Sequence, residues 1–141
     1  MPDYSIPVPR YWRRIGEYYR LEASRCLKCG KVYYPPRARC SCGSTSLEKI
    51  SLLDGNFILR EFTVLHSVPV DFEKQKPIIH GIVENVNMNI RLITQISDVL
   101  DISKLHKDIP VEPIFRVVKR DGNIGIICYG TKFRPKSIEG V

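Results

Sequence analysis

The sequence predicts a mainly β protein with an N-terminal helix, a metal-binding cysteine module and a five-stranded barrel. Three observations support this fold class: aromatic residues at helical spacing near the N-terminus, four cysteines in two close pairs, and β-branched runs between turn signals after residue 50. With 141 residues, 43% of them hydrophobic and 26% charged, the composition is that of a globular protein. We expect three segments: an arm and helix over residues 1–23, the cysteine module over 24–49, and the barrel over 50–141.

The first segment is expected to open on an extended arm, Pro2 to Pro9, because its three prolines disfavour a helix. Between Val8 and Leu21, large side chains then recur at three- and four-residue spacing and form one aromatic helical face, made of Tyr11, Trp12, Ile15, Tyr18 and Tyr19. This face packs either on the protein's own barrel or on a partner, since Trp, Tyr and Arg are enriched at protein interfaces. The sequence leaves both alternatives open.

The second segment is poor in aliphatic residues, so its hydrophobic core alone would not keep it folded. It needs a cross-link such as a bound metal ion. Its four cysteines are the candidate ligands of one structural Zn²⁺ ion, because zinc favours four thiolates in a tetrahedron: Cys26, Cys29, Cys40 and Cys42. The first pair has a two-residue spacer, and the second has the shorter spacer of one residue. The N-terminus lacks the apolar stretch of a secretory signal, and no apolar run is long enough to span a membrane. We therefore expect a cytoplasmic protein, in which cysteines bind metal more often than they form disulfides.

The third segment alternates β-branched runs with turn signals. The predicted strands are Phe57–Val68, Ile78–Val86, Ile90–Ile96, Val111–Lys119 and Ile124–Gly130. A helix is expected over Ser97–Leu105, with Ser97 or Asp98 as its cap. Three strands, a short helix and two further strands is the order of an OB-fold barrel.

Positive charge is concentrated in the N-terminal part of the chain. The net charge is +7, and residues 1–49 carry 10 Lys and Arg against 4 Asp and Glu, whereas residues 50–141 carry 12 against 11. A basic surface suits phosphates, either of nucleic acid or of a nucleotide-bearing cofactor. The alternative is a solvated basic face that keeps the protein soluble.

Nothing in the sequence indicates catalysis. Cys128 lies inside a predicted strand, where a cysteine is most simply a small core residue. The three histidines, His66, His80 and His106, are scattered, and no glycine-rich phosphate loop or helical pair of metal ligands is present. We expect a protein that is not an enzyme.

Three stretches carry a family resemblance. Cys26–Gly43 combines the two cysteine pairs with Tyr34-Pro35-Pro36-Arg37, and two further matches are Lys76–Glu84 and Thr131–Pro135. The chain resembles the acyl-CoA-associated proteins of archaea and bacteria that have an N-terminal helix, a rubredoxin-like zinc ribbon and a C-terminal OB-fold. That family usually has two residues between the second pair of cysteines, where this chain has one.

The resemblance implies a non-catalytic companion of acetoacetyl-CoA thiolase and, in archaea, of hydroxymethylglutaryl-CoA synthase, which helps to hold or pass an acyl-CoA intermediate. Candidate contacts to the phosphates of CoA are then Arg37, Lys132 and Arg134. Two rivals remain: a nucleic-acid-binding zinc-ribbon and OB module, and an adaptor with no ligand of its own. The nearly neutral barrel, with most aromatic residues outside it, argues against nucleic acid.

Overall fold

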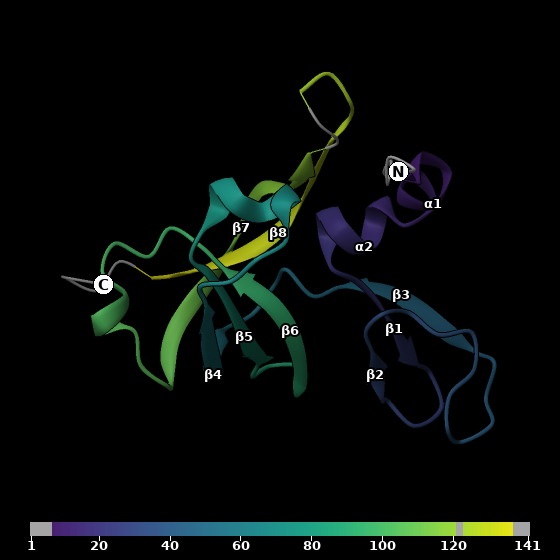
Figure 1. Cartoon of the computed structure of the whole chain (residues 1–141). Coiled ribbons are helices and arrows are strands. Elements are labelled where there is room, and N and C mark those ends of the chain that lie inside the picture. The colour runs from purple at the N-terminus through teal and green to yellow at the C-terminus, as the bar shows by residue number, and fades with distance from the viewer. Residues whose placement is uncertain (1–6, 121–122, 137–141) are drawn as a thin grey trace.

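Two short helices, a three-stranded sheet and a closed barrel follow one another along the chain (Figure 1). The computed structural model describes residues 7–120 and 123–136. The predicted mainly β fold class is confirmed, and the differences lie in the helices and in the ends of several strands. Part of the predicted N-terminal arm, residues 1–6, lies outside the described residues.

The predicted single helix is two helices, α1 (Val8–Arg13) and α2 (Ile15–Arg20). They meet at Arg14, whose φ of −103° and ψ of 13° leave the helical region. Pro9 belongs to the first turn of α1 rather than to an extended arm, because a proline in the first turn loses no intrahelical hydrogen bond. α2 ends at Leu21, which takes the left-handed conformation with a φ of 46°.

The cysteine module is a three-stranded antiparallel sheet in the order β2-β1-β3. Its strands are β1 (Glu22–Cys26), β2 (Val32–Tyr33) and β3 (Leu47–Ser51). β1 pairs with β3 along its whole length, from Glu22 opposite Ser51 to Cys26 opposite Leu47. The central strand therefore runs from the barrel side of the module directly to the first cysteine.

The barrel closes in the order β4-β5-β6-β8-β7, with β7 returning to β4. Neighbouring strands are antiparallel except β6 and β8, which are parallel where Ile96 lies opposite Phe133. This strand order is the predicted OB-fold arrangement of a five-stranded Greek-key barrel. The strands are β4 (Phe57–Leu65), β5 (Ile78–Asn85), β6 (Ile90–Ile96), β7 (Ile109–Arg120) and β8 (Ile127–Pro135).

The connection between β6 and β7 corrects the predicted helix over Ser97–Leu105. Only the 3-10 turn η2 (Ile102–Lys104) forms there, and its cap is Asp101, whose carboxylate accepts the backbone N–H of Ser103 at 3.0 Å. Ser97 continues the sheet instead, because its backbone N–H donates to the carbonyl of Phe133 at 2.8 Å. Asp98 has a φ of 57°, which ends any regular element at that point.

The limits of four other strands also differ. β5 ends one residue earlier than predicted, at Asn85, and β7 extends beyond its predicted limits at both ends, from Ile109 to Arg120. β4 ends at Leu65, short of the predicted Val68, and a 3-10 helix that the sequence did not indicate, η1 (Val70–Gln75), follows it. β8 begins and ends later than predicted, which brings the last stretch of the family resemblance into the sheet.

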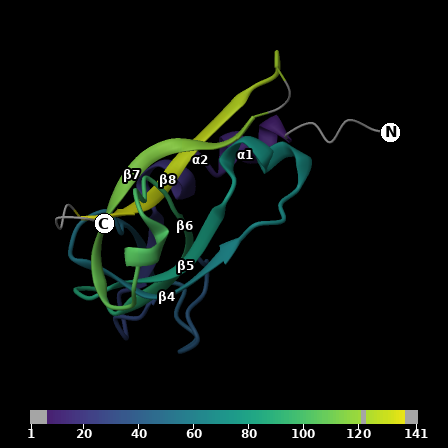
Figure 2. The same cartoon turned by 60° about the vertical axis from the view of Figure 1, so that its left-hand side comes forward.

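The barrel interior is apolar and extends to the foot of the cysteine module. Phe57 and Phe133 are 2% and 0% exposed, and their ring centroids lie 4.9 Å apart. The same buried cluster contains Leu21 and Ala23, which precede or begin the module, and Leu52, which follows it. Module and barrel therefore share one hydrophobic core. Figure 2 shows how the β7–β8 hairpin extends beyond the barrel on the side where α1 and α2 lie.

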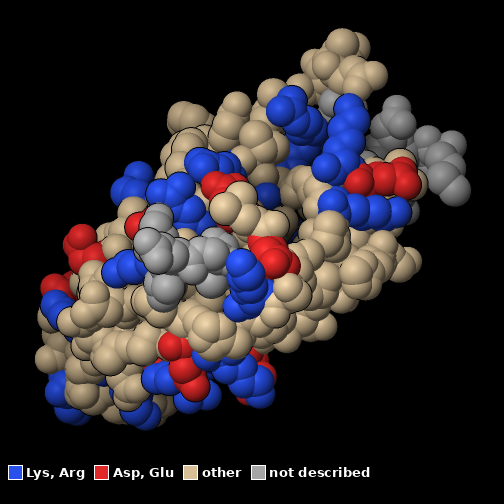
Figure 3. Space-filling view, turned by 90° about the vertical axis from the view of Figure 1, so that its left-hand side faces the viewer, with Lys and Arg blue, Asp and Glu red and all other residues tan. Residues whose placement is uncertain are grey.

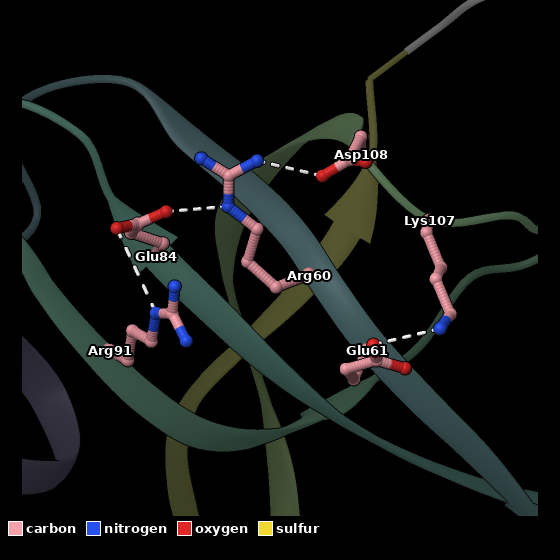
Figure 4. Close-up of polar contacts among 6 residues, drawn as sticks. All are labelled: Arg60, Glu61, Glu84, Arg91, Lys107 and Asp108. Carbon is pink, nitrogen blue, oxygen red and sulfur yellow. Dashed lines mark hydrogen bonds and ion pairs between the residues drawn. The ribbon is translucent and has the colours of Figure 1, made fainter.

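A network of ion pairs crosses the outer face of the barrel where β4 carries a bulge between Leu59 and Glu61 (Figure 4). The guanidinium of Arg60 donates to Glu84 on β5 and, at 2.7 Å, to Asp108 in front of β7. The side chain of Glu84 is 12% exposed and also faces Arg91 at 3.8 Å. The bulge thus directs one guanidinium to two carboxylates from separate strands.

We expect Glu84→Gln to destabilise the protein by about 1–2 kcal/mol, because it replaces the charged acceptor of Arg60 by a weaker, neutral one at a side chain that is only 12% exposed. The matched control is Glu61→Gln, which breaks an ion pair with Lys107 in which the two side chains are 56% and 61% exposed. That change should cost less than about 0.5 kcal/mol. Urea unfolding of both variants measures the difference, and equal losses would contradict a special role for the Arg60 network.

Candidate metal centre and basic cavity

The four cysteines of the module lie together, where β1 ends at Cys26. Their Sγ atoms all lie within 4.8 Å of one another. The Sγ atoms of Cys26 and Cys42 are 3.7 Å apart, and those of Cys29 and Cys40 are 3.3 Å apart. These separations are far longer than a disulfide bond and near the sulfur–sulfur edge of about 3.8 Å that a tetrahedron with zinc–sulfur bonds of about 2.3 Å requires.

Two glycine-ended turns bring the cysteine pairs into position. The N–H of Gly30 donates to the carbonyl of Cys26, and that of Gly43 to the carbonyl of Cys40, each at 2.9 Å. Both glycines have positive φ, 78° and 88°, a conformation that a side chain would strain. The second turn closes one residue sooner than the first, since its hydrogen bond spans three residues rather than four. The short spacer between its cysteines therefore does not keep the Sγ atoms apart.

The surroundings of Cys40 favour its thiolate form. The backbone N–H of Cys42 and then the hydroxyl of Tyr33 lower the pKa of the Cys40 thiol to about 5. The Tyr33 oxygen lies 3.3 Å from that sulfur and also 3.1 Å from the backbone nitrogen of Ser41, which donates to it. Tyr33 could not be predicted as a partner of Cys40 from the sequence, because this contact depends on how β2 faces the second turn.

The residues present fit a structural zinc ion. Four thiols at tetrahedral spacing are the donor set that Zn²⁺ prefers, and four protein ligands leave no position for a reactant. Cys26 and Cys40 are buried, whereas Cys29 and Cys42 are exposed. A bound ion would connect the two turns and so hold together a module that has little apolar core of its own.

Two of the three candidate CoA contacts lie apart from any large hollow. Arg37 belongs to the cysteine module, where its guanidinium lies 4.8 Å from the centre of the Tyr33 ring. Arg134 on β8 donates to Glu112 of β7 at 2.6 Å, so its charge is already paired. Neither residue lines the basic cavity described next.

The third candidate, Lys132, lies at a cavity of about 530 Å³ on the barrel. The cavity is enclosed by η1 and the residues after it, by the end of β6 and the loop that follows, and by β7 and β8. We call it the basic cavity, because the described part of its lining contains five cationic side chains and one acidic side chain: Lys74, Lys76, Arg116, Arg120 and Lys132, with Asp98. Figure 3 shows one face of the molecule, on which Lys and Arg are more widespread than Asp and Glu.

Lys132 is 6% exposed, an unusual burial for a lysine. Its ammonium donates at 3.0 Å to the side-chain oxygen of Gln75 in η1, which is a neutral acceptor. The nearby carboxylate of Asp98 is paired with Arg116 at 2.7 Å. Burial lowers the pKa of Lys132. The attraction of Asp98 opposes this shift, and the smaller repulsion of Arg116 adds to it.

The aromatic helical face is divided between the barrel and solvent. Tyr19 packs edge-on against Phe115 of β7 with centroids 4.9 Å apart, and Tyr11 donates its hydroxyl to the carbonyl of Tyr129 on β8. Tyr11 also stacks on Tyr18 at 5.1 Å. Trp12, in contrast, is 72% exposed. Part of the aromatic face therefore packs on the protein's own barrel, as the first of the two alternatives expected, whereas Trp12 lies on the surface.

Cys128, the fifth cysteine, is buried in β8 and lies outside the four-cysteine cluster. No helix within residues 7–120 and 123–136 has both the length and the apolar character needed to cross a membrane.

The four-thiol centre on a three-stranded sheet and the closed barrel define a protein of the zinc-ribbon and OB-fold class. The family described as "ChsH2, rubredoxin-like zinc ribbon domain" matches residues 16–48. A DUF35 domain-containing scaffold protein of Methanocaldococcus jannaschii is 40% identical over 130 residues, which are 91% of this chain and 90% of that protein. A protein of the same name from Pyrococcus furiosus is 31% identical over 92% of this chain and 93% of its own length. The chain belongs to the DUF35 family.

Solved structures agree with this fold. The structure titled "Ltp2-ChsH2(DUF35) aldolase" superposes with a TM-score of 0.68, at 22% identity, over 96% of this chain and 98% of that one. A DUF35-family protein of Sulfolobus solfataricus has a TM-score of 0.50, at 13% identity, over 80% of this chain and 81% of that one. The resemblance inferred from Cys26–Gly43 is thus confirmed at the level of family and fold.

Proposed function

We propose that this protein is a non-catalytic accessory protein that docks on an acyl-CoA-processing enzyme of the thiolase type and helps to hold an acyl-CoA intermediate. The observation that carries the proposal is the exposure of Trp12 on a helix whose neighbouring aromatic residues are held by the barrel. A Trp that is 72% exposed on an ordered helix is a typical anchor for a protein partner. Relatives over nine tenths of the chain are named scaffold proteins, which supports the same role.

The docking surface consists of α1 and the tip of the β7–β8 hairpin, which lie at the same end of the molecule (Figures 1 and 2). Its exposed apolar side chains are Val8, Trp12, Ile124, Ile126 and Ile127, and the exposed fraction reaches 72% at Trp12 and 102% at Ile124. Besides the contact of Tyr19 with Phe115, hydrogen bonds fix the helices to the hairpin: the Tyr11 hydroxyl donates to the Tyr129 carbonyl, and the Thr131 hydroxyl donates to the Tyr18 carbonyl at 3.0 Å. A surface ordered before binding loses less entropy on association.

The acyl-CoA part of the proposal is supported by the family resemblance and by the basic cavity. CoA carries phosphates, and Lys132 with the cationic rim of the cavity offers the matching charge. The metal centre has four protein ligands and serves folding rather than chemistry. The partners inferred from the resemblance are acetoacetyl-CoA thiolase and hydroxymethylglutaryl-CoA synthase, in the cytoplasm.

The structure offers little support for the rival function, nucleic-acid binding. Proteins that bind single strands place aromatic side chains for base stacking along a basic groove. Among the residues that the structure describes, no Phe, Tyr or Trp lines the basic cavity.

The proposal is tested by co-expressing the chain with an acetoacetyl-CoA thiolase and, separately, with a hydroxymethylglutaryl-CoA synthase from the same genome. We expect co-elution in size-exclusion chromatography with at least one of these enzymes. The purified chain alone should turn over no acetoacetyl-CoA. Separate elution from both enzymes would refute the docking role, and turnover that a point substitution in this chain abolishes would refute the non-catalytic role.

A further inference from the structure

We propose that the cysteine module carries a second docking surface, which receives an acidic face of a partner protein. We call this surface the cationic tip and define it by four side chains: Lys28, Lys31, Arg37 and Arg39. It is separate from the surface formed by α1 and the β7–β8 hairpin, because Figures 1 and 2 both place the loops of the module apart from those elements. The enzymes used in the second experiment rest on the proposed function, whereas the first experiment needs no enzyme.

The cations of the tip have no acidic residues to compensate them. Residues 27–46, all of which the structure describes, contain four Lys and Arg and no Asp or Glu. At the base of the module, in contrast, Arg25 is paired with Glu48, and Lys49 with Glu22. None of the four tip cations forms an ion pair within the described part of the chain. Even with the net charge of about −2 that four thiolates and one Zn²⁺ would have, the tip keeps a surplus of positive charge.

The cysteine cluster brings two of these cations together. Lys28 directly precedes Cys29, and Arg39 directly precedes Cys40, and the Sγ atoms of these two cysteines lie 3.3 Å apart. The side chains of Lys28 and Arg39 are exposed, and neither has a hydrogen bond, ion pair or ring contact among the described residues. Both are therefore available to groups outside the molecule.

The other two cations of the tip are linked through Ser41 and Tyr33. The ammonium of Lys31 donates to the Ser41 hydroxyl at 3.2 Å, and the hydroxyls of Ser41 and Tyr33 are 3.0 Å apart. The guanidinium of Arg37 lies 4.8 Å from the centre of the Tyr33 ring. Like charges gathered in this way repel one another, and carboxylates of a partner would replace that repulsion by attraction.

The side chains around the tip favour a protein partner over a nucleic acid. Base stacking needs a free aromatic ring, but one face of the Tyr33 ring is occupied by Arg37, and Tyr34 packs on the core cluster. Leu27, next to Lys28, is 64% exposed. Protein interfaces combine apolar contacts with a charged rim, and complementary charge on the two sides speeds their encounter. An exposed leucine among uncompensated cations thus matches a protein surface rich in Asp and Glu.

The first experiment measures the binding of poly-L-glutamate at low salt by titration calorimetry, with amide chemical shifts to locate it. We expect it to bind and to shift residues 27–46. Lys28→Gln/Arg39→Gln should weaken binding by about tenfold, because it removes two free charges from the tip. The matched control, Lys104→Gln/Lys136→Gln, removes the same charge from exposed positions on the barrel and should stay within about twofold of the wild type.

A charge-preserving variant separates the role of charge from that of folding. Lys28→Arg/Arg39→Lys keeps both cations and should bind poly-L-glutamate as the wild type does; a loss equal to that of the Gln variant would overturn the proposal. Equal weakening by the tip and control variants would also overturn it, since the response would then follow net charge alone. So would amide shifts confined to the barrel, or tighter binding at the tip of a single-stranded oligonucleotide or of CoA.

The second experiment measures association rates with the acetoacetyl-CoA thiolase and the hydroxymethylglutaryl-CoA synthase by biolayer interferometry. We expect Lys28→Gln/Arg39→Gln to slow the association of one of these enzymes by about 3- to 10-fold at low salt, with little change in its dissociation rate. The difference should vanish at about 1 M salt, where charges are screened over about 3 Å. Wild-type rates together with no binding of poly-L-glutamate would refute the tip and spare docking through Trp12. Poly-L-glutamate bound at the tip with neither enzyme associating would refute the proposed function and spare the tip.

Discussion

Replacing Cys29 with Ser is expected to release the metal and unfold the outer part of the ribbon while the barrel stays folded. The structural metal is the main stabilising element there, since zinc contributes about 10–16 kcal/mol to the folding of comparable small modules. Among residues 27–46, all of which the structure describes, none belongs to the fully buried part of the core cluster. The shared core is centred on Phe57 and Phe133 in the barrel, and within residues 27–46 it is contacted only by the partly buried Val32 and Tyr34, so we expect the barrel to stay folded without the ion.

Metal analysis and hydrogen exchange check this expectation. Wild-type protein should contain about one zinc per chain, and Cys29→Ser should contain much less and lose amide protection between Cys26 and Ser46. Protection in β4 to β8 should remain. The control is Cys128→Ala, which removes a thiol outside the cluster and should keep the metal. A Cys29→Ser protein with full protection in the ribbon would show that the metal is dispensable.

The second large effect is expected from Trp12→Ala, which should weaken association with a thiolase-type enzyme by about 2 kcal/mol or more, as the loss of an anchor Trp commonly does. The Tm of the isolated chain should hardly change, because Trp12 is 72% exposed and its removal empties no core site. Calorimetry with the purified enzyme and thermal melts of the lone variant measure the two quantities.

Tyr19→Ala serves as the contrast to Trp12→Ala. It removes the edge-on contact with Phe115 and should lower the stability of the isolated chain by about 1–2 kcal/mol. A Trp12→Ala variant that binds the enzyme as the wild type does would exclude α1 from the interface.

The fold was predictable where local pattern and turn chemistry agree. β6 has the predicted limits, Ile90 to Ile96, because a β-branched run lies between a tight turn and the end of the sheet pairing. The break at Arg14 was not predictable, since the aromatic spacing continues across it. The helix expected after Ser97 failed for a tertiary reason: the backbone of Ser97 pairs with Phe133, a residue 36 positions away. The apolar side chains Val99 and Leu105 of the segment 97–105 still pack on the core, as they would have done in a helix.

The same distinction between local pattern and tertiary contact applies to the candidate sites. The four cysteines are close in sequence and joined by short turns, so their convergence follows from spacing. Lys132 could be selected as a basic residue near the chain end, but its burial and the cationic neighbours Arg116 and Lys74 arise from segments far apart in the chain. The pairing of Arg134 with Glu112 depends on the register of β7 and β8, which no local pattern specifies. The roles of Arg37, Lys132 and Arg134 toward CoA remain a prediction.

The core that Leu21, Ala23 and Leu52 share with Phe57 also determines how the cysteine module is placed relative to the barrel. If a flexible linker joined the two parts, the distance between their surfaces would fluctuate. Two enzymes bound to them would then be brought together only by a raised local concentration. Here one packed interior joins the base of the cysteine module to the barrel. If two enzymes dock on the protein as proposed, this shared interior would hold them at one distance and in one mutual orientation.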